Sequence, residues 1–178
     1  MTYRVEFNAE HALLKTARTL IRNETDEEEV SNAAVAIISC AAAVEAVANG
    51  LLRDALNFQY FDELKLRSKI ELICESTSKV DWGAAPWQSI DRLVRIRNWL
   101  MHFKESDIGL INSNWNWVTD DINKKPKIDP ILELSNVSAA KYYNATLDAL
   151  RVLIECGKSN DTRFTSLIAE EFSSLQIG

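Results

Sequence analysis

The residues best suited to chemistry lie together in one stretch of the chain, SIDRLVRIRNWLMHF. Arg97 and Asn98 are adjacent, and His102 falls one turn beyond Asn98 if the stretch is helical. A guanidinium and an amide can hold a phosphate group, and a histidine titrates near neutral pH and can carry a proton. Arg97, Asn98 and His102 are therefore the candidate catalytic residues, with Arg92 and Arg95 as candidate supporting cations, although a single helical histidine is more often a packing or surface residue.

The position of Arg97 predicts a partner for it. At 100° per residue, Arg97 falls in the middle of an apolar arc made by Ile90, Leu93, Val94, Leu100 and Met101. A buried guanidinium is costly unless it is paired and hydrogen-bonded. Glu45 lies in the middle of an apolar stripe on an earlier helix, so we expect a Glu45–Arg97 ion pair. Such a pair can support catalysis, or it can be a structural pair that fixes helix register.

The elements that must position these residues are long helices, because only five glycines and three prolines interrupt the chain. Apolar periodicity predicts helices at about 9–22, 26–56, 61–75, 87–104 and 138–156, with a short tail helix at about 160–176. The sequence thus predicts a single all-α domain, an antiparallel bundle of four or five helices. An irregular insertion at about 105–135 carries Trp115 and Trp117, which we expect to clamp it onto the bundle, with a base-stacking platform as the alternative.

Composition narrows the class of protein. A net charge of −6 excludes a general nucleic-acid coat with a broad basic face, but a local basic site is compatible with it because charges are screened beyond about 10 Å. The three cysteines are odd in number and far apart, which predicts buried, reduced thiols rather than disulfides or a zinc site. The start of the chain does not read as a secretion signal, and no apolar run approaches the ~20 residues of a membrane helix. We therefore expect a cytoplasmic protein with no metal, no cofactor and no membrane contact.

The motif Arg97-Asn98-x-x-x-His102 on a late helix resembles that of the HEPN domain family. The stretch IDRLVRI before it, the residues Val44-Glu45-Ala46-Val47 on the second helix and the residues Arg67-Ser68-Lys69-Ile70 on the third also resemble this family. The resemblance covers about 9–104 and, loosely, the last long helix. It implies an all-α bundle with its working residues on the fourth helix.

The resemblance also implies an activity. Many HEPN members are metal-independent ribonucleases of toxin, anti-phage or RNA-processing systems, and they act as homodimers with a shared cleft. In such an enzyme His102 would shuttle a proton between the ribose 2′-hydroxyl and the leaving oxygen, and Arg97 would stabilise charge on the phosphoryl group. Asn98 would orient His102 or a phosphate oxygen, and Glu45 would hold Arg97. The product would be a 2′,3′-cyclic phosphate, and a toxin would have a neutralising antitoxin protein.

Two alternatives remain open at this point. Other HEPN members have kept the fold as a non-catalytic interaction or dimerisation module, and the acidic net charge favours this interpretation. The same phosphate-compatible cluster could also bind a nucleotide without cleaving it.

Overall fold

The computed structural model describes residues 8–22, 28–58, 60–75, 77, 80–101, 110–111, 117–118, 133–158, 164, 166–168 and 175–176 of the chain. The predicted all-α class is confirmed. The five α-helices are α1 (Ala9–Arg22), α2 (Glu29–Gly50), α3 (Leu66–Cys74), α4 (Trp87–Met101) and α5 (Asn136–Cys156). Three short helical turns are also present: the π-helical η1 (Leu51–Ala55) and the 3-10 turns η2 (Phe61–Glu63) and η6 (Ser166–Ile168). Two short strands, β1 (Leu110–Ile111) and β2 (Trp117–Val118), pair antiparallel.

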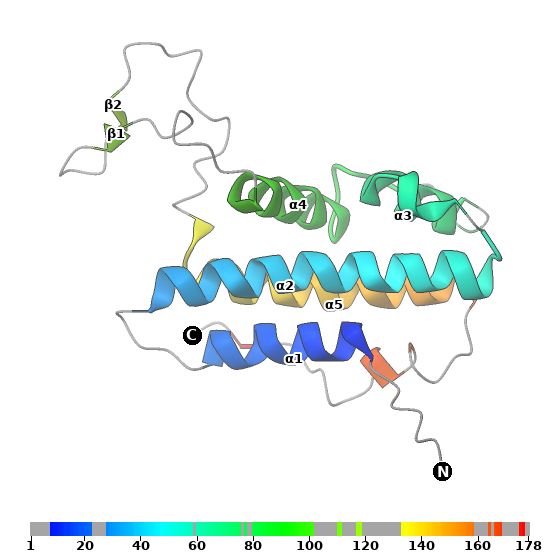
Figure 1. Ribbon diagram of the computed structural model, residues 1–178, viewed down its shortest axis with the longest axis horizontal. Coiled ribbons are helices and arrows are strands. Elements are labelled where there is room, and N and C mark those ends of the chain that lie inside the picture. Colours follow the sequence, from blue (N-terminus) through cyan, green and yellow to red (C-terminus); the bar gives the residue numbers. More distant parts are fainter. Residues whose placement is uncertain are drawn as a thin grey trace.

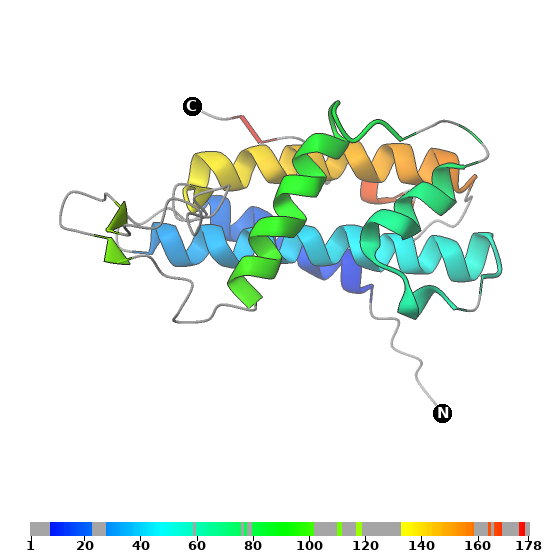
Figure 2. The same cartoon turned by 90° about the horizontal axis from the view of Figure 1, so that it is seen from above.

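The helices form layers around α2, which packs against α1, α3, α4 and α5. Helices α2 and α5 lie side by side, with α1 on one side of them and α3 and α4 on the other (Figure 1). Helix α4 crosses diagonally over α2 and α5 (Figure 2). Helix α1 runs antiparallel to α2, whereas α5 runs in the same direction as α2, so the arrangement differs from the fully antiparallel bundle predicted. The reason is that α3 and α4 lead the chain back to the end where α2 begins, and α5 starts beside it (Figures 1 and 2).

Helix α2 is the centre of the core because its own residues are small or aliphatic on nearly all sides of the helix. Its buried residues include Ala33, Ala36, Ile37, Cys40, Ala43, Val44 and Val47, and alanines allow neighbouring helices to approach closely. By length and composition alone, the segment Glu29–Asp54 could cross a membrane, but most of it is buried inside the protein. The count of consecutive apolar residues missed this segment because single polar residues interrupt it. The finding is compatible with the core helix of a soluble protein.

Helix boundaries follow the predicted ranges with two informative departures. Helix α1 matches its predicted range, and α2 continues through Gly50 into η1, while the start predicted at about 26 lies outside the described residues. The predicted helix at 61–75 is two elements, because Leu64 and Lys65 are extended, with ψ of 141° and 149°. This break turns the chain so that Ile70 and Ile73 of α3 face the core.

The described residues that follow α5 pack onto the bundle. Phe164 and Leu167 are fully buried, and the side-chain amide of Asn144 exchanges two hydrogen bonds with the backbone of Leu175, of 2.7 and 2.8 Å. His11 Nε2 lies 2.9 Å from Ser166 Oγ. Within the tail helix predicted at about 160–176, the described residues Ser166–Ile168 form a 3-10 turn.

The insertion predicted at about 105–135 is described only in part. The extended piece expected around Trp117 is present as β2, whose residues pair with those of β1. Trp115 lies outside the described residues, so neither interpretation of the tryptophans is tested. The insertion leads into α5 through Ser135, whose side chain accepts a hydrogen bond of 3.2 Å from the Ser138 backbone N–H and caps the helix.

Candidate functional site

The rotation of α4 about its axis decides where its polar residues point. Its buried residues are Trp87, Ile90, Leu93 and Ile96, a row spaced three residues apart. The Arg97 side chain is 34% exposed and Met101 is 60% exposed. The prediction that Arg97 sits at the centre of the core face is therefore wrong. The buried row includes Ile96 instead. Helix α4 crosses α2 and α5 diagonally (Figure 2), and residues at every third position make the contact in such a crossing.

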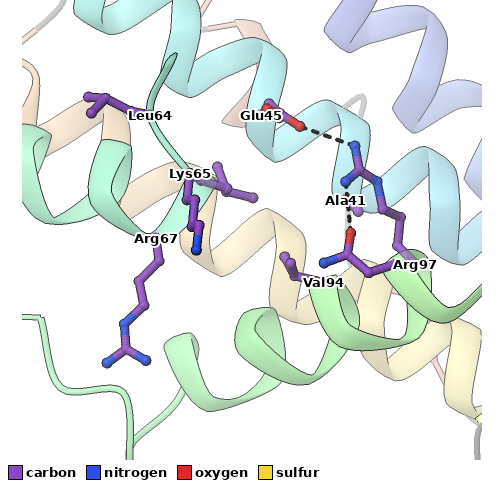
Figure 3. Close-up of a pocket in the computed structure, with 9 residues that line it drawn as sticks. Ala41, Glu45, Leu64, Lys65, Arg67, Val94 and Arg97 are labelled. Carbon is purple, nitrogen blue, oxygen red and sulfur yellow. Dashed lines mark hydrogen bonds and ion pairs between the residues drawn. The ribbon is translucent and has the colours of Figure 1, made fainter. Parts of the chain in front are cut away.

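Arg97 is held at the edge of the core by two neighbours. Its Nη2 donates to Glu45 Oε2 at 3.3 Å, and its Nη1 donates to Asn98 Oδ1 at 2.9 Å (Figure 3). The predicted Glu45–Arg97 pair is thus present. Because each side chain is about one third exposed, solvent weakens the attraction relative to a buried pair. The guanidinium has five N–H donors, and these two contacts leave three without a partner among the described residues.

Lys69 is a member of this cluster that the sequence analysis did not single out as a site residue. Its side chain is 3% exposed, and its Nζ donates to Glu45 Oε1 at 3.2 Å and to Asn49 Oδ1 at 2.7 Å. One oxygen of the Glu45 carboxylate therefore faces Lys69 while the other faces Arg97. The burial of Lys69 could have been predicted from the sequence. Lys69 lies on the same helical face as the apolar residues Leu66 and Ile73, and a lysine on such a face packs its aliphatic chain against the neighbouring helix.

Arg97 and Asn98 form part of the wall of a groove of about 380 Å³ between α2, α4 and the start of α3. Lys65 and Arg67 lie on the α3 side, across from Arg97 (Figure 3). Among the described residues Lys65 has no ion-pair partner, whereas Arg67 contacts Glu71 at 3.3 Å and stacks on the Trp82 ring at 4.6 Å. The complete lining is Ala41, Glu45, Leu64, Lys65, Leu66, Arg67, Val94, Arg97 and Asn98.

The groove therefore carries excess positive charge on a protein whose net charge is −6. Three lining cations and the buried Lys69 are accompanied by the carboxylates of Glu45 and Glu71. Arginine and lysine placed around a concave surface are the groups that recognise phosphate. The arrangement can hold a phosphate or another small anion.

The other predicted cations on α4 are engaged elsewhere. Arg92 is paired with Glu133, which also accepts a hydrogen bond of 2.7 Å from the Tyr142 hydroxyl. Burial and the bond to Glu133 raise the pKa of Tyr142 above its usual range. Arg95 is paired with Asp91, one turn earlier, at 2.6 Å. Neither arginine lines the groove, so the structure brings Arg97 together with Asn98 and Glu45 but separates Arg92 and Arg95 from them.

His102, the remaining candidate catalytic residue, lies outside the described residues. It follows directly after Met101, the last residue of α4. Its predicted role depends on how the chain continues from the end of this helix, and so it stays a prediction.

The burial predicted for the three cysteines is confirmed. Cys40, Cys74 and Cys156 are free thiols and all are buried. Burial raises the pKa of Cys40 to about 12, and burial together with the neighbouring Cys156 raises the pKa of Cys74 to about 12. In the part of the chain that the structure describes, no cluster of three or more histidine, cysteine, aspartate or glutamate side chains could hold a metal ion.

Compared with known proteins, the chain matches no protein-family model, no curated protein and no solved structure. An account of its function therefore rests on its own residues. The groove beside α4 is the candidate functional site, because it is concave, carries excess positive charge and contains a fixed guanidinium.

Proposed function

We propose that the chain is a HEPN-like, metal-independent endoribonuclease that binds an RNA phosphodiester in the groove beside Arg97. The observation that supports this proposal is the state of Arg97. Its guanidinium is fixed by Glu45 and Asn98 on the wall of an electropositive groove, and its helix leads directly to His102. A guanidinium that is oriented before the ligand arrives needs no reorganisation when charge develops on the phosphoryl oxygens.

The chemistry assigned to this site is an internal transesterification. Neutral His102 accepts the proton of the ribose 2′-hydroxyl as the 2′-oxygen bonds to phosphorus. The bond from phosphorus to the 5′-oxygen breaks, and the imidazolium returns the proton to that leaving oxygen. The N–H donors of Arg97 that have no partner among the described residues bind the non-bridging oxygens, while Asn98 orients the guanidinium. The products are a 2′,3′-cyclic phosphate and a 5′-hydroxyl.

The proposed enzyme is a homodimer, and the exposed end of α4 supports this part of the proposal. Met101, which precedes His102 in the sequence, is 60% exposed. A twofold contact at this end would cover an apolar side chain in both copies and bring two His102 residues to one cleft. Light scattering at micromolar concentration should give the mass of a dimer, and a monomer would contradict this part of the proposal.

The test is cleavage of a mixed RNA pool in EDTA. The wild type should cut RNA and leave cyclic-phosphate ends, and His102→Ala and Arg97→Gln should each slow cleavage by at least about 100-fold. Arg151→Gln is a matched control, because Arg151 lies on α5 and is paired with Asp148 at 2.7 Å. A folded wild-type protein that leaves RNA intact would refute the proposal.

A toxin or anti-phage role, with a neutralising partner protein, extends the same proposal to the cell. Induced expression of the wild type should then arrest growth, while His102→Ala should be tolerated at equal protein levels. Equal growth under both conditions would argue against a toxin, independently of the cleavage assay.

A non-catalytic interaction module is the second candidate. The Glu45–Arg97 pair favours it, because a contact of 3.3 Å between α2 and α4 can fix the register of two helices without any ligand. This candidate predicts that His102→Ala leaves every biological effect unchanged. Binding of a nucleotide without cleavage is the intermediate outcome, and a groove of about 380 Å³ is large enough for a small ligand.

A further inference from the structure

We infer that Lys69 is a positioning residue of the groove: by sharing the Glu45 carboxylate, it leaves Arg97 with positive charge available for a phosphate group. This inference deepens the proposed function, on which it rests only for the identity of the ligand as RNA. Lys69 does not line the groove, so it acts through Glu45 rather than by touching the ligand.

The contacts of Glu45 carry the inference. Its Oε1 accepts from Lys69 Nζ at 3.2 Å, and its Oε2 accepts from Arg97 Nη2 at 3.3 Å. One negative charge is thus divided between two positive charges at nearly equal distance. The three side chains together keep one net positive charge, whereas Glu45 and Arg97 alone would be neutral.

The burial of Lys69 is difficult to explain by packing alone. Its side chain is 3% exposed, and an ammonium group is costly to remove from water. An apolar side chain could tie α3 to α2 without that cost. Lys69 is held in place by Asn49 Oδ1 at 2.7 Å as well as by Glu45, so the structure keeps a full positive charge behind the groove wall.

Phosphate is the ligand class that fits this charge. Among the described residues, the ammonium of Lys65 and three N–H donors of Arg97 have no partner, and these groups lie on opposite walls of one groove (Figure 3). A planar guanidinium can bind two phosphate oxygens at once, and a lysine contributes a point charge. A phosphate monoester or diester in the groove would neutralise the one net positive charge that remains on Glu45, Lys69 and Arg97 together.

The experiment uses two probes that do not depend on cleavage: a short fluorescein-labelled oligodeoxynucleotide, followed by anisotropy, and inorganic pyrophosphate, followed by calorimetry. Lys69→Met should weaken the binding of both probes by about tenfold or more, because Glu45 then neutralises Arg97. For the oligonucleotide, the slope of log affinity against log salt should become shallower by about 0.7, the equivalent of one lost phosphate contact. Lys141→Met, which removes an exposed lysine on α5, should change neither quantity.

The decisive variant is the double substitution Lys69→Met with Glu45→Gln. It removes both the lysine and the carboxylate, so the three positions again carry one net positive charge, that of Arg97. Affinity should therefore return to within about threefold of the wild type. A lysine that only supports the fold would not be rescued in this way, since a second substitution in the same cluster would add damage. Failure of the double variant to recover affinity, with cooperative unfolding intact, would overturn the inference.

Glu45→Gln alone provides a test that does not require Lys69→Met to fold. Because it removes the neutralising charge, keeps both cations and leaves an amide oxygen that can still accept from Arg97, it should bind pyrophosphate more tightly than the wild type. Equal or weaker binding by this variant, or no binding of either probe by the wild type, would overturn the inference.

The two proposals fail separately. Lys69-dependent binding of pyrophosphate without cleavage of RNA would refute the nuclease and leave the role of Lys69 standing. Cleavage of RNA by Lys69→Met at the wild-type rate, with unchanged binding, would refute the role of Lys69 and leave the nuclease standing.

Discussion

Replacing Ile96 by alanine tests the rotation of α4, on which the position of Arg97 depends. Ile96 is 1% exposed and belongs to the buried row of this helix. The substitution removes three carbon groups, worth about 0.8 kcal/mol each in transfer free energy, or about 2.4 kcal/mol. The cavity left behind raises the expected loss in the free energy of unfolding to about 3–4 kcal/mol.

Met101→Ala is the matched comparison, because Met101 is 60% exposed and should lose less than about 0.5 kcal/mol. Urea unfolding measures both values, and thermal unfolding should show a melting temperature lower by about 6–16 °C for Ile96→Ala. If α4 were rotated to place Arg97 at the centre of the core, Ile96 would be exposed and the order of the two losses would reverse. Equal losses, or a larger loss for Met101→Ala, would refute the account of the site.

Three further predictions concern elements that hold the fold around the groove. Ser135→Ala removes the cap of α5, a hydrogen bond of 3.2 Å from the Ser138 N–H. The free energy of unfolding in urea should fall by about 1 kcal/mol, and an unchanged urea midpoint would contradict this. Gly157→Ala should destabilise the protein by about 1–3 kcal/mol, because its Cβ would lie 3.0 Å from the fully buried Leu51 side chain, and a gain in stability would show that this contact relaxes. Cys74 should react with a disulfide reagent at pH 8 far more slowly in the native than in the unfolded chain, because its pKa is raised to about 12 and only its thiolate reacts; equal rates would contradict its burial.

Most of the fold could be predicted from the sequence, because apolar residues at helical spacing and the scarcity of glycine and proline both indicate long helices. Helix α1 has the predicted range, and α4 begins at the predicted residue. The direction of α5 relative to α2 could not be predicted in this way, because periodicity reports which face is buried and not which helix buries it. The break at Leu64 and Lys65 was also missed, since neither residue type interrupts a helix by itself.

The site was predictable where charge conflicted with its apolar surroundings. The sequence predicts the Glu45–Arg97 pair because each charge falls in the middle of an apolar stripe on a helical wheel, and the structure places the two side chains 3.3 Å apart. The face of Arg97 was misjudged by a fraction of a turn, because the buried row of α4 includes Ile96 and not Arg97. Lys69 was not predicted as a site residue because lysine usually lies on the surface. Its burial depends on Glu45 and Asn49, which lie on another helix.

The chain is acidic, but the groove is basic because Glu45 is shared between two cations, Lys69 and Arg97. Twenty lysines and arginines are outnumbered by 26 aspartates and glutamates, so attraction over long distances does not favour a polyanion. Binding must then come from short-range contacts, where a fixed guanidinium and a desolvated charge are strongest. A carboxylate that held Arg97 alone would position it but cancel its charge. Lys69 resolves this conflict, because Glu45 can orient the guanidinium while the cluster stays positive.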